Sequence, residues 1–144
     1  MSSEPILQVR DLHVHYATES GDLAAVRGLD FSLHAGEALA IVGESGSGKS
    51  ATAMAIMGLQ TENAHVEGSI LLHGEQFLDA DDERLSSLRG KSIAMVFQDP
   101  LSSMTPVYTV GEQLVESIQI HQSCSKQAAE ARAIELLDLS LIHI

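Results

Sequence analysis

The sequence predicts an α/β fold whose mixed sheet contains antiparallel and parallel strands, and three observations lead to this prediction. A glycine-rich stretch at residues 43–50 stands between a short apolar run, 38–42, and an Ala/Met/Ile-rich segment, 51–59. Strand, loop and helix in this order are typical of a phosphate-binding loop. Alternating apolar residues predict two strands before the loop, and a second continuous apolar run, 92–97, has the character of a buried parallel strand.

The glycine-rich stretch reads Gly-Glu-Ser-Gly-Ser-Gly-Lys-Ser and fits G-x-x-x-x-G-K-[ST] at every fixed position. Its glycines permit a tight turn whose backbone N–H groups form an anion site with the start of the following helix. We expect Lys49 to reach the β- and γ-phosphates of a nucleotide, and the Ser50 hydroxyl to bind Mg²⁺. The alternative, a glycine-serine turn that matches by chance, is disfavoured by the flanking segments. The residues predicted to bind nucleotide here are Gly43, Glu44, Ser45, Gly46, Ser47, Gly48, Lys49, Ser50 and Ala51.

Composition limits the partners of the chain. The formal net charge of its 144 residues is −12, with only 8 Lys and Arg, which disfavours nucleic acid but not ATP. The hydrophobic content of 44% is sufficient for a core, and an aromatic content of 3% makes that core aliphatic. Its one cysteine, Cys124, allows no internal disulfide and fits a reducing compartment. No signal peptide and no membrane-spanning run of about 20 residues is visible, so we expect a cytoplasmic protein, for which any membrane role must come through partners.

Two strands are predicted ahead of the phosphate loop. Residues 6–16 alternate between apolar and polar, with a phase change near Asp11 that predicts a bulge. A turn at 19–22 leads into a second strand, 24–34. In simple nucleoside kinases and small GTPases the loop usually follows the first strand, so an additional β-layer comes first here. The core residues expected from the second strand are Val26, Phe31 and Leu33.

A further strand and a short helix are predicted after residue 60. Residues 61–67 form a polar connector, and 68–73 a strand closed by Gly74. The acidic run 79–83 favours a helix start through the backbone dipole, with Leu85 and Leu88 on one side.

The last third of the sequence predicts two helices. Thr109 and Glu112 form a capping box for a helix that reaches about His121. Ser123 or Ser125 caps a second helix that runs through residue 138. The residues expected to face inward from these helices are Val110, Leu114, Ile118, Ile134 and Leu137.

With these motifs the chain resembles the nucleotide-binding subunits of ATP-binding cassette (ABC) transporters, most closely the importers of di- and oligopeptides with relatives for nickel and glutathione. The resemblance spans residues 5–138, and its most specific parts are Leu-Arg-Gly-Lys-Ser-Ile-Ala-Met-Val-Phe-Gln-Asp-Pro at 88–100 and Pro-Val-Tyr-Thr-Val-Gly-Glu-Gln at 106–113. Thr105 stands where this branch commonly has Asn, a small departure. The resemblance implies a truncated, ABC-type P-loop NTPase domain over residues 1–138. It comprises an antiparallel β-subdomain and P-loop core, 1–100, and the start of a helical subdomain, 101–138.

The resemblance also implies roles and partners. Tyr16 corresponds to the aromatic residue that stacks on the adenine ring of ATP. Gln98 corresponds to the hinge glutamine that reaches Mg²⁺ and the attacking water, so Lys49 and Gln98 are the expected catalytic residues. The implied partners are a second ATP-binding subunit, integral membrane permease subunits and, indirectly, a solute-binding protein. The implied location is peripheral, on the cytoplasmic face of the membrane.

Several segments that the family uses for hydrolysis do not occur in the sequence: a Leu-Ser-Gly-Gly-Gln-like signature, a Mg²⁺-binding Asp with a catalytic Glu, and a switch His. We therefore expect the 144-residue chain to have negligible ATPase activity by itself, and its two parallel strands to lack neighbours. Residues 139–144, Leu-Ser-Leu-Ile-His-Ile, match a translation of the end sequence of a transposon adapter used for DNA libraries. We expect them to be a non-native tail.

Other functions stay open at this point. A DNA-repair or chromosome-structure ATPase head shares the cassette core, but the net charge of −12 argues against it. A P-loop kinase for a small metabolite would leave the two strands before the loop unexplained, and a non-catalytic fragment is the third alternative. His13 and His15 share a strand face, but no third metal ligand lies near them in sequence.

Overall fold

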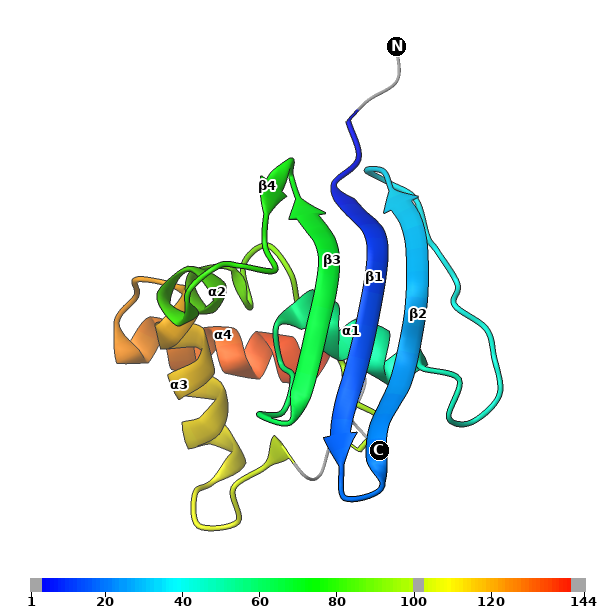
Figure 1. Ribbon diagram of the computed structural model, residues 1–144. Coiled ribbons are helices and arrows are strands. Elements are labelled where there is room, and N and C mark those ends of the chain that lie inside the picture. Colours follow the sequence, from blue (N-terminus) through cyan, green and yellow to red (C-terminus); the bar gives the residue numbers. More distant parts are fainter. Residues whose placement is uncertain (1–3, 100–102, 141–144) are drawn as a thin grey trace. The chain divides into compact units, whose positions relative to one another are not determined.

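The computed structural model describes residues 4–99 and 103–140, and the chain divides into two compact units, Met1–Ile93 and Ala94–Ile144 (Figure 1). The first unit holds the sheet and two helices, and the second holds the last two helices. The domain boundary expected after residue 100 lies outside the described residues, as do residues 141–144 of the expected tail.

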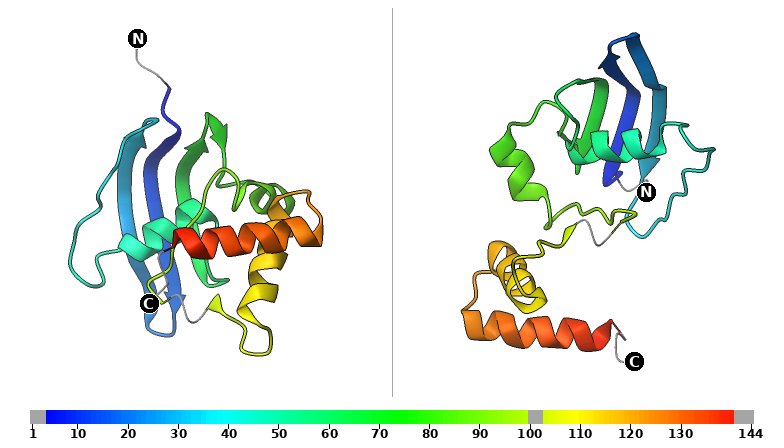
Figure 2. Two further views of the ribbon diagram at one scale, coloured as in Figure 1. Left: turned by 180° about the vertical axis from the view of Figure 1, so that it is seen from behind. Right: turned by 90° about the horizontal axis from the view of Figure 1, so that it is seen from below.

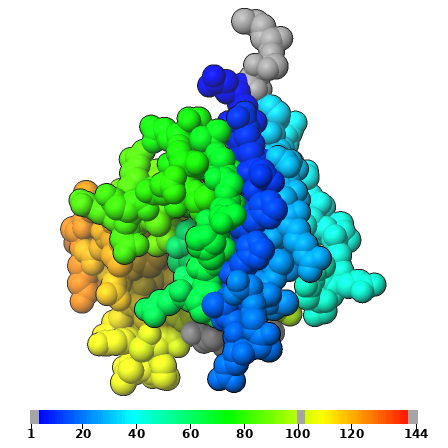
Figure 3. All heavy atoms as spheres, in the orientation of Figure 1, coloured from blue at the N-terminus to red at the C-terminus, as the bar shows by residue number. Residues whose placement is uncertain are grey.

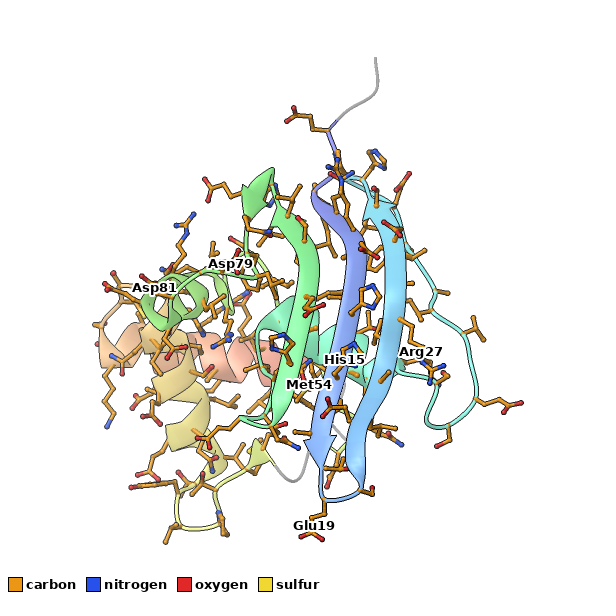
Figure 4. All side chains as sticks on the ribbon, viewed as in Figure 1. His15, Glu19, Arg27, Met54, Asp79 and Asp81 are labelled. Atoms are coloured by element: carbon orange, nitrogen blue, oxygen red, sulfur yellow. The ribbon has the colours of Figure 1, made fainter. Side chains whose placement is uncertain are left out.

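The first unit is built on an antiparallel sheet with strand order β2-β1-β3-β4 (Figure 1). Its strands are β1 (Leu7–Thr18), β2 (Gly21–Leu33), β3 (Ala64–Leu72) and the two-residue β4 (Glu75–Gln76). Both strands predicted before the loop are confirmed, and Glu19 lies at the tip of the hairpin that joins them (Figure 4). The connector predicted at 61–67 is wrong from Ala64 onward, because Ala64 and Val66 pair with Tyr16 and Val14 and extend β3.

The predicted bulge in β1 is confirmed at Asp11. Its φ is 46°, and the register of β1 shifts between Val9 and Leu12 against β2. The phase change keeps apolar residues on one face, so Val9, Leu12 and Val14 are all at most 1% exposed. That face packs against α1 (Lys49–Met57), which lies in front of the sheet in the left view of Figure 2. The buried cluster consists of Val9, Leu12, Val14, Val26, Ala55, Ile70, Phe77 and Leu85.

The helices of the first unit begin and end at the predicted signals. Gly58 ends α1 with a φ of 62°, and its N–H donates to the Ala55 carbonyl at 3.1 Å. The acidic run leads into α2 (Asp82–Leu88), whose first turn is capped by the Asp81 carboxylate (Figure 4). Leu85 is buried, and Leu88, predicted on the same side of the helix, packs against the same core cluster. Of the core residues expected in β2, Val26 is buried, whereas Phe31 and Leu33 are only half-buried.

The two predicted parallel strands, 38–42 and 92–97, are wrong as strands in the described structure. Both runs are irregular apart from an isolated parallel bridge between Arg89 and Ile93. Val42 is 90% exposed and Val96 94% exposed. An apolar run becomes a strand only where a neighbour accepts its backbone hydrogen bonds. Within the described ranges neither run is paired with a strand of the sheet.

The second unit is a helix pair. The helices α3 (Val110–His121) and α4 (Lys126–Leu139) bury Val115, Ile118, Ala129 and Ala133 between them. The capping box at Thr109 and the cap at Ser125 are confirmed. The predicted inward face is correct for Ile118 but wrong for Val110, Ile134 and Leu137, which are 52%, 62% and 37% exposed. Ala129 and Ala133 are buried in their place, at 0% and 4% exposed.

Thr109→Ala is expected to destabilise this helix pair by about 1 kcal/mol, because α3 loses its N-cap. Two hydrogen bonds from Thr109 to the Glu112 carboxylate lower the pKa of Glu112 below its ordinary value. The bond from the Thr109 backbone N–H has the larger effect, and the bond from its hydroxyl the smaller one. A pKa lowered by folding stabilises the helix above the unfolded-state pKa, and this contribution is lost as the pH falls through the folded-state pKa. Circular dichroism melts should therefore separate Glu112→Gln from wild type most clearly at about pH 7, and the separation should shrink as the pH falls below 4.5, the ordinary pKa of this group. Glu116→Gln, on the exposed side of α3, is the matched control.

Candidate functional site

The glycine-rich loop lies where the sequence predicts it, and it packs against β2. The loop ends at Gly48, which has a φ of 90° and is the N-cap of α1. A Cβ atom added at Gly48 would overlap the carbonyl oxygen of Ala25 in β2. Only glycine combines this positive φ with such a close backbone approach. The structure therefore gives a physical reason for glycine at this position of the motif.

Lys49 holds the loop closed. Its Nζ donates to the carbonyl oxygens of Gly43 at 2.8 Å and Glu44 at 2.7 Å, and to the Ser47 hydroxyl at 3.3 Å. An ammonium group has three protons, so these contacts use its full donor capacity. The loop thus curls around a cation, and an incoming phosphate would compete with these oxygens for it.

The start of α1 is suited to an anion. Gly48 supplies no side-chain cap, and the first turn contains no acidic residue. The N–H groups of this turn have no acceptor within the helix, and the helix dipole makes this end positive. The Ser50 hydroxyl has no hydrogen-bond partner among the described residues. A free hydroxyl beside bound phosphates is the kind of oxygen ligand that Mg²⁺ accepts, so the residues present fit a magnesium nucleotide.

A cavity of about 520 Å³ lies between β2 and this loop. Among its described lining residues only Arg27 and Lys49 are charged, and both are cations. The net charge of the whole chain is −12. The lining of this cavity therefore has the opposite sign to the chain as a whole, which favours an anionic ligand.

Tyr16 is connected to the loop helix through a residue that sequence reasoning did not single out. The Tyr16 hydroxyl donates to Gln60 Oε1 at 2.9 Å, and Gln60 Nε2 donates to the Ala51 carbonyl at 2.9 Å. Tyr16 is half-buried and packs against the core cluster. No sequence signal marked Gln60, a polar residue shortly after a helix-ending glycine. Stacking of adenine on Tyr16 stays a prediction.

Gln98 is exposed and lies in an irregular stretch of the second unit. Lys49, Ser50 and Ala51 are the first residues of α1, directly after the loop, and Gln60 connects Tyr16 to Ala51. Gln98 belongs to the other unit and is not part of this described cluster. Its role toward Mg²⁺ stays a prediction.

Figure 3 shows the face of the sheet that is turned away from α1, and His15 lies on this face (Figure 4). The rings of His13 and His15 stack at 6.2 Å, and His13 Nε2 lies 3.0 Å from Asp11 Oδ1. Across the part of the chain that the structure describes, no three His, Cys, Asp or Glu side chains are grouped to hold a metal ion.

A loop of the pattern G-x-x-x-x-G-K-[ST] that opens a helix with a free anion-binding end places the chain in the class of P-loop nucleotide-binding proteins. Residues 26–142 match the family model described as ABC transporter, so the chain belongs to the ABC transporter family. The family expected from residues 43–50, 88–100 and 106–113 is thereby confirmed.

Curated relatives are peptide-transport proteins. The oligopeptide transport ATP-binding protein OppD of Mycobacterium tuberculosis is 52% identical over 94% of this chain and 22% of its own length. OppD of Escherichia coli is 46% identical over 94% of the chain and 40% of its own length. The dipeptide transport ATP-binding protein DppD of Lactococcus lactis is 44% identical over 95% of this chain and 40% of its own length. The chain thus spans two fifths or less of these relatives.

Solved structures confirm the α/β cassette fold. A dimeric structure of MJ0796, a bacterial ABC transporter cassette, matches with a TM-score of 0.78 and 25% identity, over 92% of this chain and 56% of that one. A post-hydrolysis dimer of the same cassette with ADP and Pi gives a TM-score of 0.76 at 23% identity and the same coverage. None of the helices in the described residues has the length and apolar character needed to cross a membrane.

Proposed function

We propose that the protein to which this chain belongs binds and hydrolyses Mg·ATP and thereby energises an importer of peptides or related small solutes. The observation that carries the proposal is the Lys49 ammonium held inside the loop at 2.7–3.3 Å from three oxygens, next to an uncapped helix start. That arrangement presents a cation and free N–H groups to one anion.

The groups at the end of the loop and the start of α1 have separate proposed tasks. Lys49 exchanges its bonds to Gly43 and Glu44 for bonds to the β- and γ-phosphates, and the N–H groups from Gly48 to Ala51 hold the remaining phosphate oxygens. Ser50 contributes its hydroxyl to Mg²⁺, which when bound neutralises charge on the phosphates. Gln98 would be a further ligand of this ion and would orient the attacking water, and Tyr16 would stack on the adenine.

The relatives support the choice of cargo and partners. Their names assign them to oligopeptide and dipeptide transport. By likeness, this subunit pairs with a second ATP-binding subunit, docks peripherally on permease subunits at the cytoplasmic face, and serves a solute-binding protein indirectly. Dimers of the MJ0796 cassette support the first of these partners.

Calorimetric titration with Mg·ATP tests the proposal, with Lys49→Ala as the decisive variant. The substitution is expected to weaken binding at least tenfold, because a charge-assisted bond to phosphate is lost. Lys91→Ala removes the same charge from an exposed position of the same unit and should bind like wild type. Equal affinity for Lys49→Ala and wild type, or no affinity in wild type, would contradict the proposal. In the same samples we expect negligible ATP turnover by the 144-residue chain.

A further inference from the structure

Gln60 joins two parts of the site that are far apart in sequence. Its side chain accepts from the Tyr16 hydroxyl and donates to the Ala51 carbonyl, both at 2.9 Å and both part-buried. Ala51 lies in the first turn of the helix that begins at the phosphate loop. A single amide group therefore spans the gap between the aromatic ring and this helix.

The orientation of the Gln60 amide is fixed by chemistry. A carbonyl oxygen only accepts hydrogen bonds, so the NH₂ group must face Ala51, and Oε1 then faces the Tyr16 hydroxyl. Glutamate could not donate to Ala51, and leucine could do neither. Glutamine is one of the few side chains that offers a donor and an acceptor at this reach.

The segment after Gln60 strengthens the same connection. The backbone N–H of Ala17 donates to the Asn63 carbonyl at 2.9 Å, and Asn63 Nδ2 donates back to the Ala17 carbonyl at 3.2 Å. Residues 60–63 therefore hold the end of β1 at several points. The Tyr16 ring is fixed at its base by strand pairing with Leu23 and Ala64, on one side by the core cluster, and at its tip by Gln60.

We propose that Gln60 is a positioning residue, which sets the Tyr16 ring at a fixed distance from the phosphate loop so that adenine and phosphates are bound together. This inference rests on the proposed function, since it requires Tyr16 to contact adenine. Its specific consequence is that Gln60 contributes to recognition of the base and not to recognition of the phosphates.

The test compares Mg·ATP with magnesium tripolyphosphate, which has the phosphates without the nucleoside, in calorimetric titrations of the whole chain. Gln60→Leu is expected to weaken Mg·ATP binding about three- to tenfold, a part of the stacking energy of one base. Tripolyphosphate affinity should be unchanged. Tyr16→Phe keeps the ring and its packing but loses the bond to Gln60, and it should give the same selective loss. Gln8→Leu, at the opposite end of β1, is the matched control.

The outcomes separate the two proposals. Equal losses for both ligands would show a merely structural role for Gln60, and no loss for either ligand would show no role, so both results overturn the inference. If Gln60→Leu does not fold, Tyr16→Phe decides in the same way. Wild type that binds both ligands equally would overturn the adenine contact and this inference, while leaving phosphate binding intact. Wild type that binds neither ligand would overturn the proposed function itself.

Discussion

Gly48→Ala is expected to abolish nucleotide binding and to destabilise the first unit by about 2 kcal/mol or more. Two effects add at this position. A residue with a Cβ atom is strained at a φ of 90°, which costs about 1–2 kcal/mol. The new methyl group would also overlap the Ala25 carbonyl oxygen, so the loop must move away from β2. Since the displaced residues include the N–H groups proposed to hold phosphate, binding should be lost together with stability.

Urea unfolding and Mg·ATP titration of the same samples measure the two effects. Gly74→Ala is the matched control, because Gly74 has a φ of 82° but a Cβ atom added there would meet nothing within 4 Å. It should show the strain alone and leave binding unchanged. If Gly48→Ala were no less stable than Gly74→Ala, the close approach of the loop to β2 would be wrong.

Elements that depend on sequence neighbours could be predicted from the sequence. The capping box of α3 requires only Thr109 and Glu112, and the end of α1 requires only a glycine able to adopt a positive φ. The bulge at Asp11 was visible because alternation changes phase there. In each case the physical cause lies within a few residues of its effect.

Elements that depend on distant partners could not be predicted in the same way. The runs 38–42 and 92–97 are apolar enough for buried strands, but backbone pairing decides whether a strand forms. Likewise Ile134 and Leu137 have helical spacing, but packing against α3 favours the alanine face of α4.

The candidate site also contains one part that depends on sequence neighbours and one part that depends on distant residues. The loop from Gly43 to Ala51 was predictable because a contiguous motif carries its chemistry. The contact between Tyr16 and Gln60 joins residues that are 44 positions apart. Neither side chain carries a local signal of the other, so only the folded chain shows that the aromatic ring and the loop helix are connected.

Leu12→Ala is expected to cost about 2–5 kcal/mol of the free energy of unfolding, measured by urea denaturation. Leu12 directly follows the bulge and is 0% exposed, with Val9, Val14 and Ile70 in the same cluster. Close packing around it leaves little room for collapse, so truncation should create a cavity. A domain is stable by only about 5–15 kcal/mol, so this loss is a large fraction of the total.

Leu23→Ala makes the same chemical change in the neighbouring strand, where the side chain is 58% exposed. Its cost should lie within about 0.5 kcal/mol, as for most surface substitutions. Without the phase change at Asp11, the second half of β1 would turn its apolar side chains away from α1. The difference in unfolding free energy between the two variants therefore measures the stability gained by placing Leu12 in the core. Similar costs for both variants would mean that the register shift does not place Leu12 in the core.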